Sequence, residues 1–464
     1  MKRLILIICL VLSVVAYFEA PIGFSERFTV SLSIIFGISS LVMLRNNCKH
    51  TIIKFEFFFV LAFFFTNVIY TLVYYQVNPY FGLFNLPFNE DYISRGFALS
   101  VLGICAFNLG VFENKSYFIK KQNTCNEHFG SPKVATILLM LLFLPYMFTL
   151  IQRHMYTTEF ESNLVNVVLV YLVYFSLFYI IYYNRQANNI GRLIKNNVNN
   201  TLVYFIIVYF LVFIIIGSRT IPLRIILFSL FIYSVYIQPI KTYKVAFIIL
   251  IGAVFMAFLG VSRSGGTFSL DAASSIFDIG KELTINNRSL YVLMEYADEK
   301  GVTYGESMLM GVLSIIPFAQ KIYLLLTGNP LSSISSGVLV TDLYYETSND
   351  DRVGLGTNII GDIYLAYGML GVLFLMFIFG KFVSYIYRKA SKGINLYIFL
   401  YGSIFMDAIY YPRSTILTSA RAFVWLFIIF QIYRNKKVKT GLEKLNSDPP
   451  IIQGTTLTVK NNQV

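Results

Sequence analysis

The sequence predicts an all-α polytopic membrane protein with about twelve transmembrane helices and one large extracytoplasmic loop, which carries short amphipathic or re-entrant helices. Two observations predict this class. Hydrophobic residues make up 56% of the 464 residues and charged residues only 13%, whereas a soluble domain has about 25% charged residues. The apolar residues are also gathered into long runs, and a single segment of backbone in lipid can satisfy its own hydrogen bonds only as a helix.

The predicted spans have the length that a bilayer requires, about 20 mainly apolar residues. They lie near residues 4–19, 28–44, 55–75, 93–112, 134–151, 164–183, 201–217, 221–238, 245–261, 359–380, 394–411 and 415–433. The first run follows a basic N-terminus and resembles a signal peptide, but no small-residue cleavage site follows it. We therefore expect it to remain as a spanning helix.

The positive charges alternate along the chain in a way that predicts orientation. With the N-terminus in the cytoplasm, every second loop is rich in lysine and arginine, beginning with Arg45, Lys49 and Lys54. The short loops between them contain arginine but no lysine. This bias follows the positive-inside rule, so both termini are predicted to be cytoplasmic. The net charge of +13 is then explained by topology and does not point to nucleic acid.

The stretch of residues 307–326 is apolar enough to be a further span. A crossing there would turn the basic loop after residue 380 outward, and Pro317 and Lys321 interrupt the stretch. We expect a re-entrant or interfacial segment instead. Four regions result. They are residues 1–261 with nine helices, 262–358 as a large periplasmic loop, 359–433 with three helices, and 434–464 as a disordered cytoplasmic tail.

Arginines on the extracytoplasmic side are the candidate binding residues. The planar guanidinium group fits phosphate oxygens with two parallel hydrogen bonds and stays charged when partly buried. Charges at or within span ends need a partner, and a lipid-linked phosphate or pyrophosphate has its headgroup at that depth. The candidates are Arg219, Arg224, Arg263, Arg288, Arg352, Arg413 and Arg421. The alternative for any one of them is snorkelling or pairing with a carboxylate of the loop.

Two carboxylates are candidate functional residues because they fall in or at the predicted spans. Asp407 is expected inside the eleventh span, and Asp362 opens the tenth within a glycine-rich stretch. A carboxylate in a membrane is a functional candidate by default, although a structural ion pair with an arginine is the alternative. The four cysteines and three histidines match no metal or redox pattern, so no metal and no cofactor are expected.

The spans, the large loop after the ninth of them and the outer arginines together resemble O-antigen polymerases of the Wzy type. The run "VGLGTNIIGDIYLAYGMLGVLFLMFIFG" is similar to the segment by which that family leaves its large loop, with Asp362 where many relatives carry Glu. "YYPRSTILTSARAFVW" is similar to the family's terminal arginine-bearing hairpin.

This resemblance implies a glycosyltransferase of the bacterial inner membrane that acts in lipopolysaccharide biosynthesis. It would join undecaprenyl-diphosphate-linked oligosaccharide repeat units, as both donor and acceptor, into a polysaccharide on the periplasmic face, without a cofactor. The resemblance also allows a chain-length regulator protein as a partner. The arginines would stabilise the charge on the departing pyrophosphate. Asp362 or Asp407, with Asp350 and Asp351 behind them, would accept the proton of the sugar hydroxyl.

Three other functions are considered. An O-antigen ligase generally has a histidine in its large outer loop, and residues 262–358 contain none. A flippase or other transporter of lipid-linked oligosaccharides predicts paired broken helices in two similar halves, and the sequence has no internal repeat. A membrane protein without any chemistry leaves the outer arginines unexplained.

Overall fold

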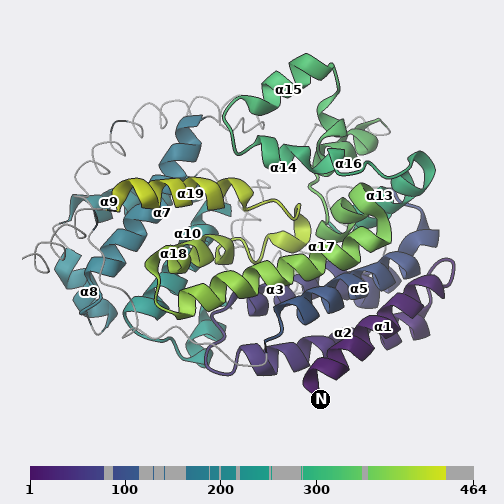
Figure 1. Ribbon diagram of the computed structural model, residues 1–464, viewed down its shortest axis with the longest axis horizontal. Coiled ribbons are helices and arrows are strands. Elements are labelled where there is room, and N and C mark those ends of the chain that lie inside the picture. Colours follow the sequence, from purple (N-terminus) through teal and green to yellow (C-terminus); the bar gives the residue numbers. More distant parts are fainter. Residues whose placement is uncertain are drawn as a thin grey trace, which may run out of the picture.

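The structure is a computed structural model that describes most of the residues of the chain. These are residues 1–77, 87–113, 129, 141, 164–187, 189–197, 200–215, 220–249, 252, 284, 286–346 and 354–434. Every regular element in this part of the chain is helical, and a single isolated bridge joins Phe129 to Arg434. The helices form two groups that lie side by side (Figure 1).

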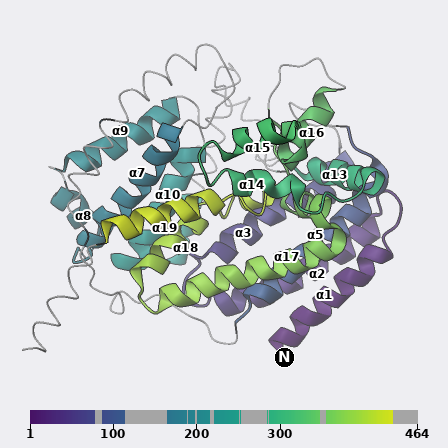
Figure 2. The same ribbon diagram turned by 45° about the horizontal axis from the view of Figure 1, so that its top comes forward.

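The first group is built around α5. Its members are α1 (Lys2–Phe18), α2 (Glu26–Asn47), α3 (Phe55–Phe63) with its continuations η1 (Phe64–Tyr74) and α4 (Tyr75–Val77), η2 (Glu90–Tyr92), α5 (Ile93–Val111), α13 (Asn287–Lys300) and α17 (Ile359–Ser391). Helix α5 contacts α1, α2 and α17 and is buried over nearly its whole length. Figure 2 shows α1, α2, α5 and α17 running roughly side by side.

Glycines allow α5 and α17 to approach each other backbone to backbone. A Cβ atom at Gly110 would lie 2.3 Å from the carbonyl oxygen of Phe377, and one at Gly380 would lie 2.5 Å from that of Phe107. Small residues at such seams are characteristic of helix packing in membranes, where close contact replaces the hydrophobic effect as the driving force.

We expect Gly110→Ala to destabilise the protein by about 1–3 kcal/mol, because the added methyl group meets backbone atoms that cannot rotate away. Thermal unfolding of the purified protein in detergent measures this. Gly37→Ala is the matched control, since a Cβ atom there meets nothing within 4 Å and Gly37 is also helical. Equal melting temperatures for the two variants would contradict a tight α5–α17 seam.

The second group has an aromatic core. Its members are α7 (Leu164–Tyr183), α8 (Ile190–Asn197), α9 (Thr201–Ile215), α10 (Thr220–Tyr236), α18 (Asn395–Phe405) and α19 (Ala420–Tyr433). Phe178, Phe399 and Phe430 lie at its centre with ring centroids 4.9–5.8 Å apart. Helix α17 joins the two groups through its contact with α18.

In the first group, the ends of neighbouring helices contact each other at two places, one at each end of the group. At one end Lys2 donates to Asn46, and Lys54 donates to the backbone carbonyl of Asn47. We call this the Lys54 end. At the other end the amide of Gly23 donates to the carbonyl of Asp91, and Arg95 donates to the hydroxyl of Tyr17. We call this the Arg95 end. The helix directions therefore alternate as the spans of the sequence require.

The helices agree with an all-α membrane protein, but the structure does not establish twelve spans. Four helices of the described part are long and apolar enough to cross a membrane, or five if the bent pair Ile190–Asn197 and Thr201–Ile214 is one span. The four are Glu26–Asn47, Phe55–Tyr74, Glu90–Val111 and Ile359–Ser391. Of the predicted span 134–151 only Leu141 belongs to the described residues, and of the predicted span 245–261 only residues 245–249 and 252 do.

The last two predicted spans differ from the expectation of full-length helices. Helix α18 ends at Phe405, so its 11 residues cover about 16 Å of a hydrocarbon core about 30 Å thick. Helix α19 begins only at Ala420. Between them, turns and the short helix η6 (Tyr411–Arg413) fill the remaining depth, with Pro412 in the first turn of η6. Asp407 therefore lies beyond the end of α18 and not inside a helical span.

Helix α17 also departs from the predicted span 359–380, because it continues to Ser391 and is broken near its start. Gly368 has φ +65° and ψ −163°, which is outside the helical region and strained for any residue with a side chain. The segment Ile359–Tyr367 is thus a short helix of its own.

The described part of the predicted large loop, residues 262–358, contains short helices. They are α13, η4 (Glu306–Met308), α14 (Leu309–Leu313), α15 (Ala319–Thr327), η5 (Leu331–Ser333) and α16 (Ser336–Tyr345). The apolar stretch 307–326 is interrupted before α15, where Phe318 follows Pro317 with φ +66°. Neither α14 nor α15 is long enough to span a bilayer. Of the predicted tail 434–464, only Arg434 belongs to the described residues.

Candidate functional site

The irregular chain between α18 and α19, residues 406–419, is the centre of the candidate site. Several of its side chains are buried, among them Met406, Asp407, Tyr411 and Ser419. Turn hydrogen bonds satisfy part of its backbone, for example from the amides of Tyr410 and Tyr411 to the carbonyl of Asp407. Non-helical backbone at membrane depth is tolerated only where protein buries it or where it lines a water-filled cavity. Such a segment is therefore a functional candidate on physical grounds.

Asp407 and Arg224 form an ion pair across the two elements. Arg224 on α10 donates from Nε to Oδ1 of Asp407 at 2.5 Å, and Ser419 donates to Oδ2 at 2.5 Å. The carboxylate is 2% exposed, whereas the arginine side chain is 27% exposed. Asp407 thus holds the guanidinium group of Arg224 in place.

Two more of the predicted arginines lie around the same pair. The guanidinium carbon of Arg413 is 5.7 Å from the centre of the Tyr410 ring, and that of Arg224 is 5.3 Å from the same ring. Arg421 at the start of α19 is within hydrogen-bonding reach of the Tyr171 hydroxyl on α7. The electrostatic neighbours of that hydroxyl include Asp407 and Arg224. The structure therefore brings Arg224, Arg413 and Arg421 together, and we call them the arginine cluster.

Asp362 contacts the same irregular segment from the other side. It is the fourth residue of α17, is fully buried, and follows the N-cap Asn358. Ser336 donates to Oδ1 at 2.6 Å, and the backbone amide of Ile416 lies within hydrogen-bonding reach of the carboxylate. Within the described residues, the second oxygen, Oδ2, accepts no hydrogen bond. A buried polar atom left in this way requires an explanation.

Close packing against the loop fixes the short helix that bears Asp362. A Cβ atom at Gly361 would lie 3.1 Å from the Cα atom of Leu290, so α13 packs directly on this helix. The amide of Thr303 donates to the carbonyl of Leu365 at 2.9 Å. The break at Gly368 separates this position from the rest of α17. The large loop, and not the long helix alone, therefore determines where Asp362 lies.

The remaining predicted residues divide into two sets. Arg288 is fully buried in the first turn of α13. Two residues earlier, the side chain of Asn286 donates to the carbonyl of Leu355 and lies against Gly356. Gly356 in turn lies close to the backbone carbonyl of Arg413. The other set consists of Arg219, Arg263, Arg352, Asp350 and Asp351, which lie outside the described residues.

A polar network that was not predicted as part of the site lies beside Asp362. Arg95 donates to Asp298 at 2.6 Å and to the hydroxyls of Tyr17 and Tyr364 at 2.7 and 2.8 Å. Tyr364 is two residues after Asp362 and also donates to Asp298. The only sequence signal was an arginine at a helix start on the side of the other arginines. Its partners come from α1, α13 and α17, so the sequence could not pair them.

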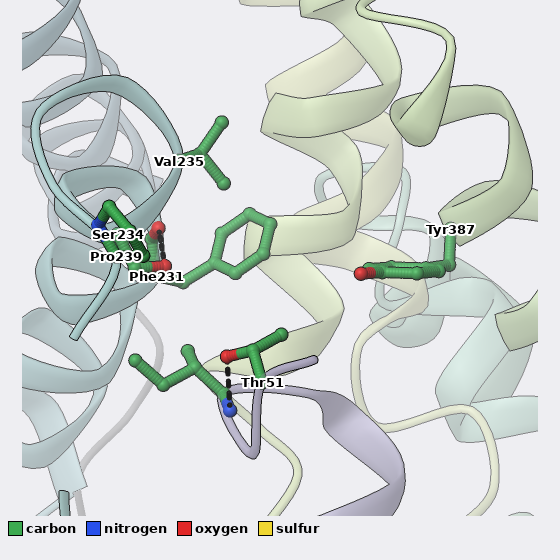
Figure 3. A pocket seen from close by; sticks show the side chains of 7 residues that line it. Thr51, Phe231, Ser234, Val235, Pro239 and Tyr387 are labelled. Atoms are coloured by element: carbon green, nitrogen blue, oxygen red, sulfur yellow. Dashed lines mark hydrogen bonds between the residues drawn. The ribbon is translucent and has the colours of Figure 1, made fainter. Parts of the chain in front are cut away.

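A cavity lies elsewhere in the protein, and Figure 3 shows the side chains that line it. It has a volume of about 290 Å³ including its open mouth and is lined by Thr51, Ile53, Phe231, Ser234, Val235, Pro239 and Tyr387. Lys54 lies 4.3 Å from the centre of the Tyr387 ring, which places the cavity at the Lys54 end. In the described part of the chain, no three His, Cys, Asp or Glu side chains are grouped so that they could hold a metal ion.

Comparison with known proteins agrees with these features. The chain matches the family model of the O-antigen polysaccharide polymerase Wzy over residues 2–438, which is nearly its whole length. No curated protein and no solved structure matches it. The match includes both helix groups, the large loop and the irregular segment 406–419. The chain therefore belongs to the O-antigen polysaccharide polymerase Wzy family.

Proposed function

We propose that the protein is an inner-membrane glycosyltransferase that uses undecaprenyl-diphosphate-linked repeat units on the periplasmic face, with the arginine cluster binding the pyrophosphate. Family membership carries the coarser statement, namely that the protein polymerises lipid-linked O-antigen repeat units. We propose in addition that the reaction takes place on the periplasmic side, that the donor is linked to undecaprenyl diphosphate, and that the residues named below have the roles given to them. The observation that supports it is the gathering of Arg224 and Arg413 on one tyrosine ring, with Arg421 beside them.

The reaction transfers the growing chain to a new repeat unit. The bond between the anomeric carbon of the donor sugar and the pyrophosphate oxygen breaks, and a hydroxyl oxygen of the acceptor sugar bonds to that carbon. The hydroxyl proton passes to a carboxylate, and polyprenyl diphosphate leaves with the bonding electrons. The protein must therefore stabilise negative charge on the leaving group and accept one proton.

The arginine cluster is suited to the first task because its charges are already in place. Asp407, which Ser419 holds by a hydrogen bond to Oδ2, pairs with Nε of Arg224 and so fixes the position of this charge. Among the described residues no carboxylate lies within 4 Å of Arg413, whose guanidinium group lies over the Tyr410 ring. Fixed donors that need not reorganise are the main source of electrostatic catalysis. Arg219, Arg263, Arg288 and Arg352 remain further candidates from the sequence.

We assign the role of general base to Asp362 and a positioning role to Asp407. Both oxygens of Asp407 already accept a hydrogen bond, from Arg224 and from Ser419. With both oxygens occupied in this way, Asp407 holds Arg224 in position and has no oxygen left to face a sugar hydroxyl. Asp362 keeps one oxygen without a hydrogen bond in the described part of the protein, and its other contacts hold it against the irregular segment.

The charge distribution supports a periplasmic site. Lys2, Lys54 and the basic end of α17, with Arg388 and Lys389, gather at the Lys54 end, which the positive-inside rule places in the cytoplasm. Helix α10 begins close to Arg224, and its last residue, Tyr236, donates to Asn395 at the start of α18. The arginine cluster is thus displaced from the Lys54 end toward the opposite membrane face.

Reconstitution tests this proposal. The purified chain in liposomes, supplied only with undecaprenyl-diphosphate-linked repeat units, should form lipid-linked oligomers and release one free polyprenyl diphosphate for each new glycosidic bond. Mass spectrometry measures both products. A ligase would form no oligomer without a lipid A core acceptor, and a flippase would move the substrate across the bilayer without forming a new bond. Either of these results would overturn the proposed reaction.

A further inference from the structure

The short helices α14 and α15, with the turn between them, expose an apolar surface that no described part of the chain covers. We call residues 309–327 the α14–α15 arm. Its exposed apolar side chains are Val312, Ile316, Phe318, Ile322, Leu325 and Leu326. Leu325 and Leu326 are 84% and 82% exposed, more than the apolar side chains on the outer surfaces of α1 and α9. Figure 1 shows α15 at the edge of the molecule.

The arm has the pattern of an amphipathic helix. Ile322, Leu325 and Leu326 lie on one face of α15 at helical spacing, and Phe318 adjoins its start, while Gln320 and Thr327 lie on the opposite face. Lys321 is on the flank of the stripe, where a long basic side chain can reach lipid headgroups. At nine residues, α15 is about 13 Å long and cannot cross a bilayer. An amphipathic helix of this kind lies in the plane of a membrane surface.

Two contacts join the arm to the membrane-spanning part of the protein. A Cβ atom at Gly311 would lie 2.6 Å from the Cβ atom of Leu417, so the arm packs on the irregular segment 406–419. The indole nitrogen of Trp425 on α19 donates to the carbonyl of Ile315 at 2.9 Å. Trp425 is the only tryptophan of the chain, and tryptophan is enriched at the boundary between lipid and water.

The surface next to this junction indicates what covers the arm. Helix α19 continues from Trp425 with the exposed apolar residues Phe427, Ile428 and Ile432, on a helix apolar enough to contact lipid. The exposed face of the arm is thus attached, at the interfacial tryptophan, to a surface that faces acyl chains. A bilayer that surrounds α19 would also cover the exposed apolar face of the arm, and no further protein is required.

We propose that the α14–α15 arm binds the lipid surface at the Arg95 end, with α15 parallel to the membrane and Leu325 and Leu326 among the acyl chains just below the headgroups. Lys321 lies at headgroup level. Because Gly311 packs on Leu417, this contact holds the irregular segment, and with it the arginine cluster, at the depth of a lipid-linked diphosphate. The lipid contact itself does not depend on the catalytic roles proposed above.

Depth-dependent quenching tests this placement. Leu325→Trp is reconstituted in bilayers whose lipids carry bromine either near the headgroup or deep in the acyl chains, and the emission of the wild-type protein, which has Trp425 alone, is subtracted. We expect the added emission to fall about twofold with shallow bromine and less with deep bromine, and to resist aqueous iodide. Glu299→Trp, on an exposed polar turn of α13, is the control and should respond to iodide alone.

Three results would overturn the proposal. Quenching of the position-325 tryptophan by iodide and not by brominated lipid would place the arm in water. Stronger quenching by deep than by shallow bromine would make the segment re-entrant. If brominated lipid quenches the position-325 tryptophan only after the protein is diluted in the bilayer, a second copy of the chain covers this face. Ile322→Trp, also on the exposed stripe, repeats the measurement if Leu325→Trp does not fold.

Discussion

Asp362→Asn should strongly reduce the rate of polymerisation while leaving the protein folded. If Asp362 accepts the proton of the acceptor hydroxyl, the rate falls by about 10²–10⁴-fold, the contribution typical of a general base. Asparagine has nearly the same shape and can still accept hydrogen bonds from Ser336 and from the amide of Ile416. It also removes a charge from a fully buried position, so the melting temperature should not decrease. Oligomer formation in proteoliposomes and thermal unfolding measure the two effects.

Ser336→Ala is the matched control for this experiment. It removes the hydrogen bond to Oδ1 but retains the carboxylate, so we expect activity to fall by less than about tenfold. If Asp362 only stabilises the irregular segment, loss of its charge should not slow the reaction. Asp362→Asn would then polymerise at a rate close to that of the wild type, and the role of general base would have to be withdrawn.

Arg413→Lys should reduce polymerisation by about 10²-fold, although the charge is kept. Lysine presents a point charge and cannot donate two parallel hydrogen bonds to a pyrophosphate, nor stack on Tyr410 as a planar group. Because Arg413 pairs with no carboxylate in the described structure, its replacement leaves no buried charge unpaired, and stability should be unchanged. The same proteoliposome assay gives the rate.

Arg388→Lys provides the comparison at the Lys54 end. Arg388 is 43% exposed and lies 3.9 Å from Glu113, so lysine can replace it with little effect on the rate. A full rate for Arg413→Lys as well would show that the cluster acts only through its net charge. Loss of folded Arg413→Lys protein would mean that the stacking on Tyr410 is structural, which also contradicts the proposed role.

Arg224 differs from Arg413 in what its loss would do. Its removal leaves Asp407, which is buried, without a counter-charge, so stability and activity would fall together. The two arginines therefore separate the functions of the cluster. One is bound into the structure of the irregular segment, and the other is anchored only by an aromatic ring in the part of the chain that the structure describes.

Much of the fold could be predicted because membrane helices are specified locally. The apolar runs at residues 28–44, 55–75 and 93–112 became helices close to the expected bounds, since twenty apolar residues in lipid have few alternatives. The sequence placed Arg219, Arg224, Arg413 and Arg421 at predicted span ends on one face of the membrane. The structure brings Arg224 and Arg413 to one tyrosine ring with Arg421 beside them, and their binding of a pyrophosphate stays a prediction. The expected spans 394–411 and 415–433 were wrong in length, because a buried segment need not be helical when neighbouring protein satisfies its backbone.

The sequence by itself determined the class of protein, the alternating orientation of the helices and the family, because apolar length, loop charge and motif are properties of consecutive residues. Only the tertiary structure decided that Asp407 holds Arg224, that Asp362 keeps an oxygen free of hydrogen bonds in the described part, and that Arg95 joins α1, α13 and α17. These contacts join residues far apart along the chain. Their geometry follows from how the helices pack, which no local pattern encodes.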